Sequence, residues 1–429
     1  MKRSGRSGFA LIGGSVALAG VMALGAPSFL PARPSFQSAA HAAPAGSIPV
    51  AFTGLSPSAL RAPSKIDYPL METRLNRLVA QKGMVGMAVA VIENGEISYL
   101  KGFGETAAGS GERVGVRTSF RWASLSKGVA GTLVADLAAE GKLSLADPVA
   151  RYSTSLRLPA GGEKRVTIAD LLSHRVGLVN NAYDDRLEGG QDPRVIRTAL
   201  GSLGAYCPPA QCHGYQNVAF DAASEIVEAV TGKRYEQVVR ERLFAPLGMT
   251  SASMTRAGLY SSGNWARPHV GRTVVAVNDS YYRVPAAGGV NSSIFDLALW
   301  MRAQMGLAGD VVPQTVLAEA HSPRVATDRR GGDFNRAMGQ SRYALGWRDY
   351  NYTGHRLVGH QGAVRGYRSS ILFDPATKSG VAVLWNSQSG KPFGVQMEIL
   401  DMLYGLERRD WTKIDGGVYA GGGVQTVAR

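Results

Sequence analysis

The chain has 429 residues, 45% of them apolar, and a formal net charge of +14 at pH 7. That apolar share excludes a disordered or collagen-like chain and is enough for two domains or one large composite domain. The positive charge does not by itself indicate nucleic-acid binding, because lysine and arginine are scattered and the densest groups are pairs such as Arg329-Arg330. We therefore expect no nucleic-acid partner.

The first 42 residues have the pattern of a secretory signal. A basic start is followed by an apolar stretch over residues 9–26 and by the small-residue site Ala40-His41-Ala42. Cleavage near Ala42 is expected, with a cut after Ala26 or an uncleaved membrane anchor as the alternatives. Residues 43–65 are rich in proline, alanine and serine and are expected to be a linker. The rest of the sequence has no segment long enough to span a bilayer, so we predict a periplasmic or secreted protein.

Strand patterns occur at both ends of the remaining chain, and helical patterns lie between them. In chain order the patterns predict a helix at 66–80, a hairpin at 87–103 turning at Asn94-Gly95, a helix after Ser124, a second hairpin at 369–385, a closing helix at 393–406 and a glycine-rich tail at 407–429. This order predicts an α/β part formed by residues 66–142 and 288–406. A mainly helical part, residues 143–287, is inserted into it.

The two cysteines of the chain, Cys207 and Cys212, stand close together with two prolines between them. In an exported protein this spacing predicts one disulfide that closes a small loop. A metal site is not expected, because only His213 is near and no Cys/His spacing of the zinc type occurs elsewhere. No cofactor is expected either.

A serine and a lysine three residues apart stand at the start of an apolar helix. Ser124-Leu125-Ser126-Lys127 precedes an apolar run that ends at Gly141. Residues three apart share a helix face, so the Lys127 side chain can reach Ser124 Oγ. A serine hydroxyl becomes a good nucleophile when a neighbouring group takes its proton, and a helix N-terminus adds partial positive charge. The alternative interpretation is an ordinary N-cap serine followed by an exposed lysine.

The same spacing occurs in Ser98-Tyr99-Leu100-Lys101, in the second arm of the first predicted hairpin. In a strand, residues three apart point to opposite faces. We therefore expect only the helical copy to bring its two side chains together.

Two further short motifs follow in the sequence. Tyr215-Gln216-Asn217 lies between the cysteine loop and a predicted helix, and His360-Gln361-Gly362 lies just before the second hairpin. Ser262-Gly263-Asn264 and Lys378-Ser379-Gly380 are weaker copies of these motifs. Lys378 falls in a predicted hairpin turn, where its side chain would face solvent.

With these three motifs in this order, residues 66–406 resemble the serine β-lactamase and penicillin-binding-protein superfamily. The similarity is strongest to its class C branch and to the related D-alanyl-D-alanine peptidases and esterases. The family pattern is Ser-x-x-Lys, then Tyr-x-Asn, then Lys- or His-x-Gly. The resemblance implies an α+β fold, with an antiparallel sheet formed by the N- and C-terminal segments, flanking helices and an inserted all-α subdomain.

The resemblance also implies a role for each motif residue. Ser124 would attack a carbonyl and become acylated, and Lys127 and Tyr215 would handle its proton, with the choice of general base left open between them. The backbone N–H groups of Ser124 and Ala363 would stabilise the oxyanion. Asn217 would orient Lys127 or a substrate amide. His174 is expected to be a buried structural histidine. His213 is expected to lie at the surface, with a place at the fringe of the site as the alternative, and Trp347 is expected to wall the cleft or pack in the core.

The third motif leaves the substrate open, because His360 stands where class C β-lactamases have lysine. A largely neutral histidine holds a substrate carboxylate weakly, and Arg365, shortly after Gly362, is the predicted replacement. Arg365 could instead point into solvent. We expect a serine hydrolase that acts on a β-lactam or D-alanyl peptide, with an esterase or a protein that acylates without turnover as the alternatives. The predicted partner is a small-molecule or peptide substrate, and the predicted oligomeric state is a monomer.

Overall fold

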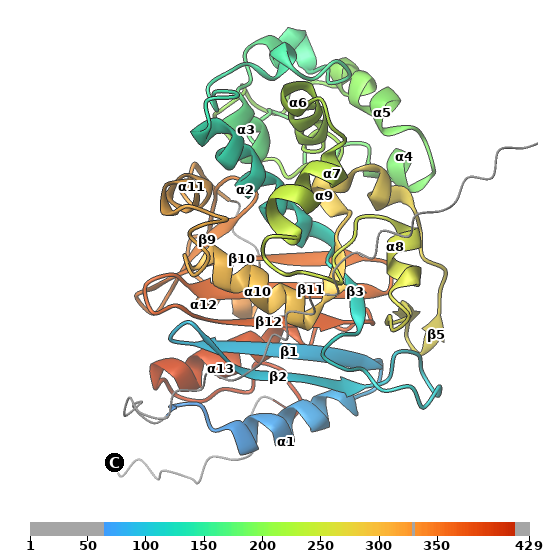
Figure 1. The fold of residues 1–429 in the computed structure, drawn as a ribbon, viewed down its shortest axis with the longest axis vertical. Helices are drawn as coiled ribbons and strands as arrows, with labels where there is room; N and C mark the ends of the chain where they lie inside the picture. Colours follow the sequence, from blue (N-terminus) through green and yellow to red (C-terminus); the bar gives the residue numbers. More distant parts are fainter. Residues whose placement is uncertain (1–63, 328–330, 417–429) are drawn as a thin grey trace, which may run out of the picture. The chain divides into compact units, whose positions relative to one another are not determined.

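The structure is a computed structural model that describes residues 64–327 and 331–416 (Figure 1). The predicted signal segment, nearly all of the predicted linker and the end of the predicted tail lie outside the described residues.

An eight-stranded sheet is built from both ends of the chain in the order β2-β1-β12-β11-β10-β9-β8-β7. The N-terminal hairpin of β1 (Gly86–Glu93) and β2 (Glu96–Gly104) joins the C-terminal strands because β1 pairs antiparallel with β12 (Ser379–Trp385). The other strands are β7 (Val325–Ala326), β8 (Arg342–Tyr343), β9 (Arg348–Tyr352), β10 (His355–Val364) and β11 (Tyr367–Asp374). Each neighbouring pair is antiparallel, which confirms the predicted α+β fold.

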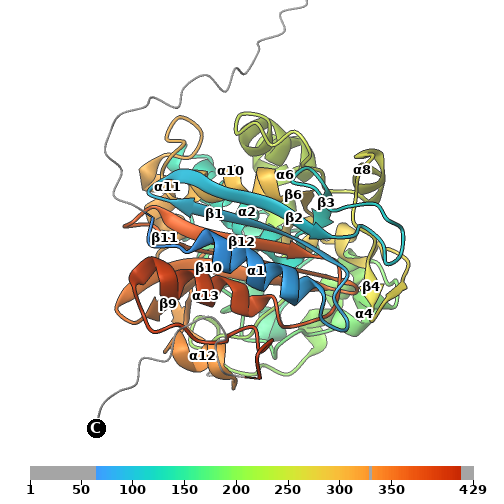
Figure 2. The same ribbon diagram turned by 90° about the horizontal axis from the view of Figure 1, so that it is seen from below.

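Both faces of the sheet are buried under helices. Met87, Val89 and Val91 of β1 belong to the core shared with α1 (Tyr68–Val79) and α13 (Phe393–Tyr404), which lie side by side on one face (Figure 2). The intervening residues Ala88, Ala90 and Ile92 belong to the core on the other face, which includes residues of α2 (Ser126–Ala139) and α10 (Ile294–Gln304). The alternation follows from the two-residue period of a strand, and it explains why β1 is apolar throughout.

Helix α2 is buried along most of its length. Glycines allow its close packing, because a Cβ on Gly131 would lie 1.8 Å from Leu345 O and one on Gly128 would lie 2.6 Å from the Trp347 ring. Trp347 is 1% exposed and does not line the cleft described below, so of its two predicted positions the structure shows the core.

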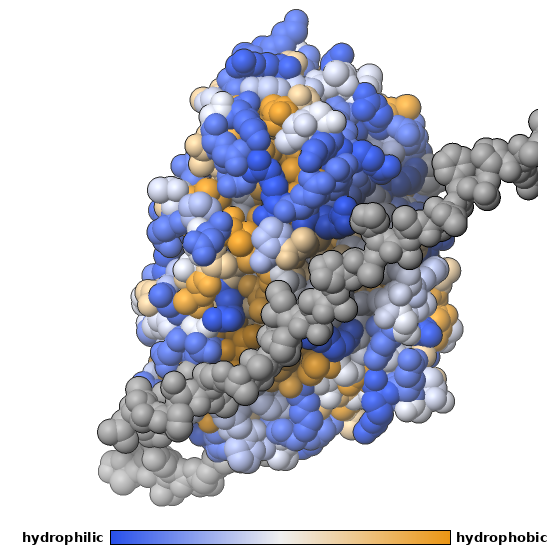
Figure 3. Space-filling model, in the orientation of Figure 1, coloured by the Kyte–Doolittle hydropathy of each residue, from blue (hydrophilic) through white to orange (hydrophobic). Residues whose placement is uncertain are grey.

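The inserted part is mainly helical, but its helices are short. They are α3 (Ile168–Leu172), α4 (Asp184–Glu188), α5 (Pro193–Ala199), α6 (Ala222–Thr231), α7 (Tyr235–Val239), α8 (Arg256–Ser261) and α9 (Pro285–Gly288). It also contains the small hairpin of β4 (His269–Val270) and β5 (Thr273–Val274), while β3 (Ser119–Arg121) pairs with β6 (Asn291–Ser293). In Figure 3 the surface of this part is mostly hydrophilic. Hydrophobic residues are more frequent below it, around the height at which Figure 1 labels α10.

Helix α11 (Gln314–Ala320) precedes β7, and α12 (Asp333–Ala337) lies between β7 and β8. Beyond α13, residues 407–416 pack back onto the domain, where Arg74 of α1 is 3% exposed and forms ion pairs with Glu398 and Asp410 at 2.6 and 2.9 Å. Across residues 64–327 and 331–416, no helix is both long and apolar enough to cross a bilayer.

Candidate active site

Ser124 lies in a strained turn at the entrance to α2. Residues Ala123–Leu125 form a 3₁₀ turn that leads directly into the helix at Ser126. Ala123 has a φ of 51°, a left-handed conformation that costs about 1 kcal/mol or more for a residue with a Cβ. Ser126 fixes the turn, since its Oγ donates to Ala123 O at 2.7 Å and accepts from the Val290 N–H at 3.0 Å. The helical turn therefore brings the Ser124 and Lys127 side chains together, as the spacing predicts.

Lys127 is completely buried and has three polar contacts. Its Nζ lies 3.4 Å from Ser124 Oγ, 2.7 Å from Asn217 Oδ1 and 2.9 Å from Ala287 O. It also lies 4.8 Å from the centre of the Tyr215 ring. No carboxylate of the described residues forms an ion pair with it. The group is thus held by neutral acceptors and aimed at the serine hydroxyl.

Asn217 connects Lys127 to an acid that the sequence motifs do not contain. Its Nδ2 donates to Asp184 Oδ2 at 2.6 Å, so the amide is fixed with its oxygen toward Lys127. Burial raises the pKa of Asp184, while the hydrogen bond from Asn217 and the charge of Lys127 oppose that rise. Asp184 comes from the start of α4, and no local pattern in the sequence marks it.

His174 holds Tyr215 in place through hydrogen bonds with the residues on either side of it. Gly214 N–H donates to His174 O at 2.9 Å, and Gln216 N–H donates to His174 Nδ1 at 3.1 Å. The His174 ring packs 4.3 Å from the Tyr215 ring, centre to centre. Burial, with help from the nearby His213 and Lys127, lowers the pKa of His174 well below 6.5, which keeps Nδ1 an acceptor. His174 is buried as expected.

His213 does not lie at the surface, which was the favoured of its two predicted positions. It is only 5% exposed, because its ring packs against His174 and Tyr343. A position next to an exposed disulfide loop suggested a surface residue, but this segment turns inward behind Tyr215.

The edge of β10 forms the opposite wall of the site. Pairing between β10 and β9 stops at Gly359, so the strand has a free edge over His360 to Val364 in the described sheet. Gly362 packs directly on the turn that carries Ser124, where an added Cβ would lie 2.2 Å from Trp122 O. Glycine is therefore required for the edge to approach Ser124. Ala363, whose N–H is the predicted second oxyanion donor, is exposed and lines the cleft.

Both ring nitrogens of His360 are engaged within the protein. Nδ1 lies 2.7 Å from Gln361 O, and since a carbonyl only accepts, Nδ1 carries the proton. In the neutral ring Nε2 then accepts from the Tyr343 hydroxyl at 2.8 Å. A neutral His360 consequently has no N–H left for a substrate carboxylate.

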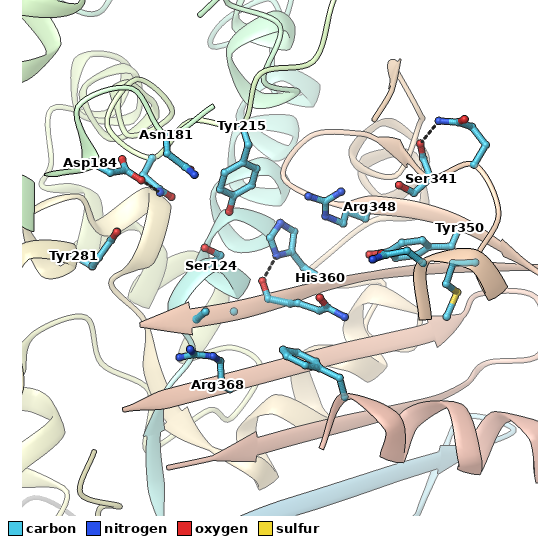
Figure 4. Close-up of a pocket in the computed structure, with 18 of the residues that line it drawn as sticks. Ser124, Asn181, Asp184, Tyr215, Tyr281, Ser341, Arg348, Tyr350, His360 and Arg368 are labelled. Carbon is cyan, nitrogen blue, oxygen red and sulfur yellow. Dashed lines mark hydrogen bonds between the residues drawn. The ribbon is translucent and has the colours of Figure 1, made fainter. Parts of the chain in front are cut away.

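An open cleft of about 1010 Å³ lies above Ser124, between the β10 edge and the inserted helical part (Figure 4). On one side of Ser124, the side chains of Tyr215, His360 and Arg348 point toward a common space. Asp184 and Tyr281 lie on the other side, and Arg368 lies below the strand edge. Ser124, Tyr215, Asn217, His360, Gly362 and Ala363 all line this cleft, so the structure brings the three motifs together.

Arg365 is the predicted substrate-binding residue that does not line the cleft. It is exposed in the turn between β10 and β11, ahead of Gly366, whose φ is 81°. Arg348, at the start of β9, does line the cleft and has no carboxylate within 4.0 Å among the described residues. Register explains its position, because Arg348 pairs with Gly359, the residue before His360.

The other Ser-x-x-Lys copy is not a site. Ser98 Oγ donates to Val91 O, and Lys101 forms an ion pair with Glu72 on the surface. No group of three or more His, Cys, Asp or Glu side chains is placed to hold a metal ion within the parts of the chain that the structure describes.

Cys207 and Cys212 form a disulfide, as predicted. The loop packs on the segment after His174, since Ala210 N–H donates to Arg175 O and Tyr206 N–H donates to Gly177 O, both at 2.8 Å. Tyr215 follows three residues after Cys212. The disulfide therefore supports the loop that carries the cleft phenol.

We expect the double variant Cys207→Ser/Cys212→Ser to affect activity more than stability. A loop this small accounts for about 2 kcal/mol of stability, so the protein stays folded, but the backbone before Tyr215 gains freedom. The check is a thermal melt beside a measurement of the Ser124 acylation rate. A lower melting temperature together with an unchanged acylation rate would contradict this prediction.

Comparison with known proteins gives consistent results. Residues 71–406 match the model of the Beta-lactamase family. Unguisins hydrolase ungD of Aspergillus violaceofuscus (strain CBS 115571) is 26% identical over 366 residues, covering 76% of this chain and 64% of that protein. Protein flp of Staphylococcus aureus (strain COL) is 24% identical over 317 residues, covering 72% of this chain and 61% of that protein. This chain thus spans less than two thirds of either relative.

Two solved structures share the fold. The octameric penicillin-binding protein homologue from Pyrococcus abyssi has a TM-score of 0.71 at 25% identity, covering 80% of this chain and 78% of that one. The D-stereospecific amidohydrolase from Streptomyces sp. has a TM-score of 0.59 at 20% identity, covering 75% of this chain and 94% of that one. With the family model matching most of the sequence, this chain belongs to the beta-lactamase family of serine hydrolases.

Proposed function

We propose that this protein is an exported serine hydrolase that cleaves the amide bond of a β-lactam or D-alanyl peptide through an acyl-enzyme on Ser124. The contact that carries the proposal is the 3.4 Å approach of the buried Lys127 Nζ to Ser124 Oγ at the floor of the cleft. A hydroxyl is suited to nucleophilic attack when an amine that can take its proton in the uncharged form lies beside it and a helix N-terminus lies behind it.

In the proposed reaction, Ser124 Oγ attacks the carbonyl carbon and its proton passes to Lys127 or Tyr215. The backbone N–H groups of Ser124 and Ala363 stabilise the oxyanion. As the C–N bond breaks, Tyr215 or Lys127 passes this proton to the leaving nitrogen. Water then hydrolyses the ester bond to Ser124. In this proposal the leaving group occupies the space toward which the side chains of Tyr215, His360 and Arg348 point (Figure 4).

Arg348 is the side chain best placed to bind a carboxylate on the leaving group. It lines the cleft beside His360 and has no acidic partner among the described residues, whereas Arg365 lies outside the cleft. A guanidinium can bind a carboxylate through two hydrogen bonds. This supports an amide substrate with a terminal carboxylate.

We expect Arg348→Gln to raise KM for carboxylate-bearing substrates by about tenfold to 100-fold, because a charge-assisted hydrogen bond is lost. Neutral esters should be unaffected, and Arg365→Gln is the matched control that changes neither. Steady-state kinetics on one peptide and one short ester decides the point. Equal effects on both substrates would remove the carboxylate role.

The engagement of both His360 nitrogens favours a second candidate, an esterase of the same family. Incubation with a chromogenic β-lactam, a D-alanyl-D-alanine peptide and a short-chain ester separates the two. Turnover beyond one equivalent of β-lactam or peptide supports the first function. Turnover of ester alone supports the second, and a stoichiometric burst without turnover indicates a binding protein.

Export is supported by the signal pattern of residues 1–42 and by the disulfide, which forms in oxidising compartments. Amino-terminal sequencing of the exported protein tests cleavage near Ala42. The predicted monomer remains a prediction, and light scattering tests it against the octamer described for the Pyrococcus homologue.

A further inference from the structure

A buried acid lies one helical turn after the Tyr-x-Asn motif, outside the cleft. Asp221 precedes α6 and is 1% exposed. Its backbone N–H donates to Asn217 O at 3.1 Å, and its Oδ1 accepts from the Ala286 N–H at 2.9 Å. Its Oδ2 accepts from Arg197 Nη1 at 2.8 Å.

The two segments that Asp221 contacts also contain groups that hold Lys127. Asn217 supplies the acceptor Oδ1, and Ala287, the residue after Ala286, supplies its carbonyl oxygen. One residue therefore contacts both segments that supply the Asn217 and Ala287 acceptors of Lys127 Nζ, although it touches neither Lys127 nor the cleft. Without Oδ1 as an acceptor, the Ala286 N–H would be a buried donor without its partner, and the turn of α9 would shift.

Building on the proposed function, we propose that Asp221 is the positioning residue for Lys127, and that its ionised carboxylate sets the distance between Lys127 Nζ and Ser124 Oγ. A carboxylate can accept from the Ala286 N–H and from Arg197 at the same time. A protonated acid or an amide has a donor in place of one of these acceptor positions. The geometry of Lys127 thus depends on the charge of a residue outside the substrate cleft.

The surroundings of Asp221 make this dependence relevant near neutral pH. The charged and titratable groups around it are Arg197 from α5, Glu225 from α6 and Tyr235 from α7. Burial raises the pKa of Asp221 to about 7, against the lowering effects of Arg197 and the Ala286 N–H. Since the acid gains a proton as the pH falls through that value, Ser124 acylation should weaken on the acid side.

Glu225 provides a matched control in the same ion network. It also pairs with Arg197, at 3.0 Å, but its other partners are Arg194, at 3.1 Å, and Ser153, Thr154 and Ser155, all far from α9 in the sequence. Burial alone would raise the pKa of Glu225, but hydrogen bonds from Ser155 and Ser153 and the charge of Arg197 lower it to about 2. Glu225→Gln therefore removes a buried carboxylate without touching the Ala286 peptide.

The experiment is the rate of Ser124 acylation by a fluorophosphonate probe between pH 5 and 9, with thermal melts, for the wild type, Asp221→Asn and Glu225→Gln. We expect the wild-type rate to fall as the pH drops through about 7. Asp221→Asn should be acylated at least about tenfold more slowly at pH 8, and its rate should not fall as the pH drops through about 7. Glu225→Gln should keep the wild-type fall in rate, whatever its melting temperature. An unchanged profile in Asp221→Asn, or the same change in both variants, would overturn the proposal.

A crystal structure of Asp221→Asn gives a readout that does not depend on activity. We expect Lys127 Nζ to lose its contact with Ala287 O and to move away from Ser124 Oγ. Retention of both Lys127 acceptors would overturn the role of Asp221. If no probe acylates wild-type Ser124, the proposed function fails instead, and this structure still decides whether Asp221 positions Lys127.

Discussion

Replacing Ser124 with alanine is expected to abolish covalent labelling by a fluorescent penicillin or a fluorophosphonate and to lower turnover by on the order of 10⁵-fold or more. Ser124 Oγ is the hydroxyl that lines the cleft beside Lys127, and without it no acyl-enzyme can form. Loss of one hydroxyl from a partly exposed side chain should leave the melting temperature nearly unchanged. Gel fluorescence and an intact-mass measurement check the loss of the adduct.

Two serine variants provide the controls. Ser98→Ala changes the other Ser-x-x-Lys copy, on β2, and should label like the wild type. Ser126→Ala should still label but be less stable, because its buried hydroxyl connects Ala123 O to the Val290 N–H. Labelling of Ser124→Ala at the wild-type rate would exclude Ser124 as the nucleophile.

Lys127→Met is expected to slow Ser124 acylation by about 10² to 10⁴-fold, the range for loss of a positioned proton acceptor. Methionine keeps an unbranched, flexible stem but leaves Asn217 Oδ1 and Ala287 O without their donor, at about 1–3 kcal/mol for each buried acceptor. The rate of acylation under single-turnover conditions measures the effect directly.

The surface residue Lys101 provides the matched control. It is 45% exposed and paired with Glu72, so Lys101→Met should change neither the rate nor the stability by a measurable amount. Lys127→Met that acylates at the wild-type rate would leave Tyr215 as the proton acceptor, and the same assay on Tyr215→Phe would show it.

The sequence predicted what local geometry determines. Ser124 and Lys127 meet because residues three apart share a helix face, and Ser98 and Lys101 do not because they lie on a strand. The sheet was predictable because two hairpin patterns stand at the two ends of the domain. The glycine at 362 belonged to a motif, but only the structure shows that a Cβ there would collide with Trp122 O.

Residues that reach the site through the tertiary fold could not be found in this way. Asp184 and Asp221 lie in segments without a recognisable motif, and their roles arise from contacts with Asn217 and Ala286. Arg365 was predicted to bind substrate because it is close to Gly362 in the sequence. Gly366, however, marks a tight turn whose exposed residues point outward. This glycine is a sequence signal that could have placed Arg365 outside the cleft. Arg348 reaches the cleft through strand register, which one sequence does not reveal.

The pairing of β1 with β12 has a consequence for how the protein reaches its active form. Met87 lies opposite Trp385, so the central strands of the sheet meet only after nearly the whole domain has been synthesised. Contacts so distant in sequence slow folding, and until they form the strand edges stay unpaired. The β10 edge that completes the cleft also comes from this late segment. A nascent or truncated chain that ends before residue 355 would therefore carry Ser124 and Lys127 without a catalytic site.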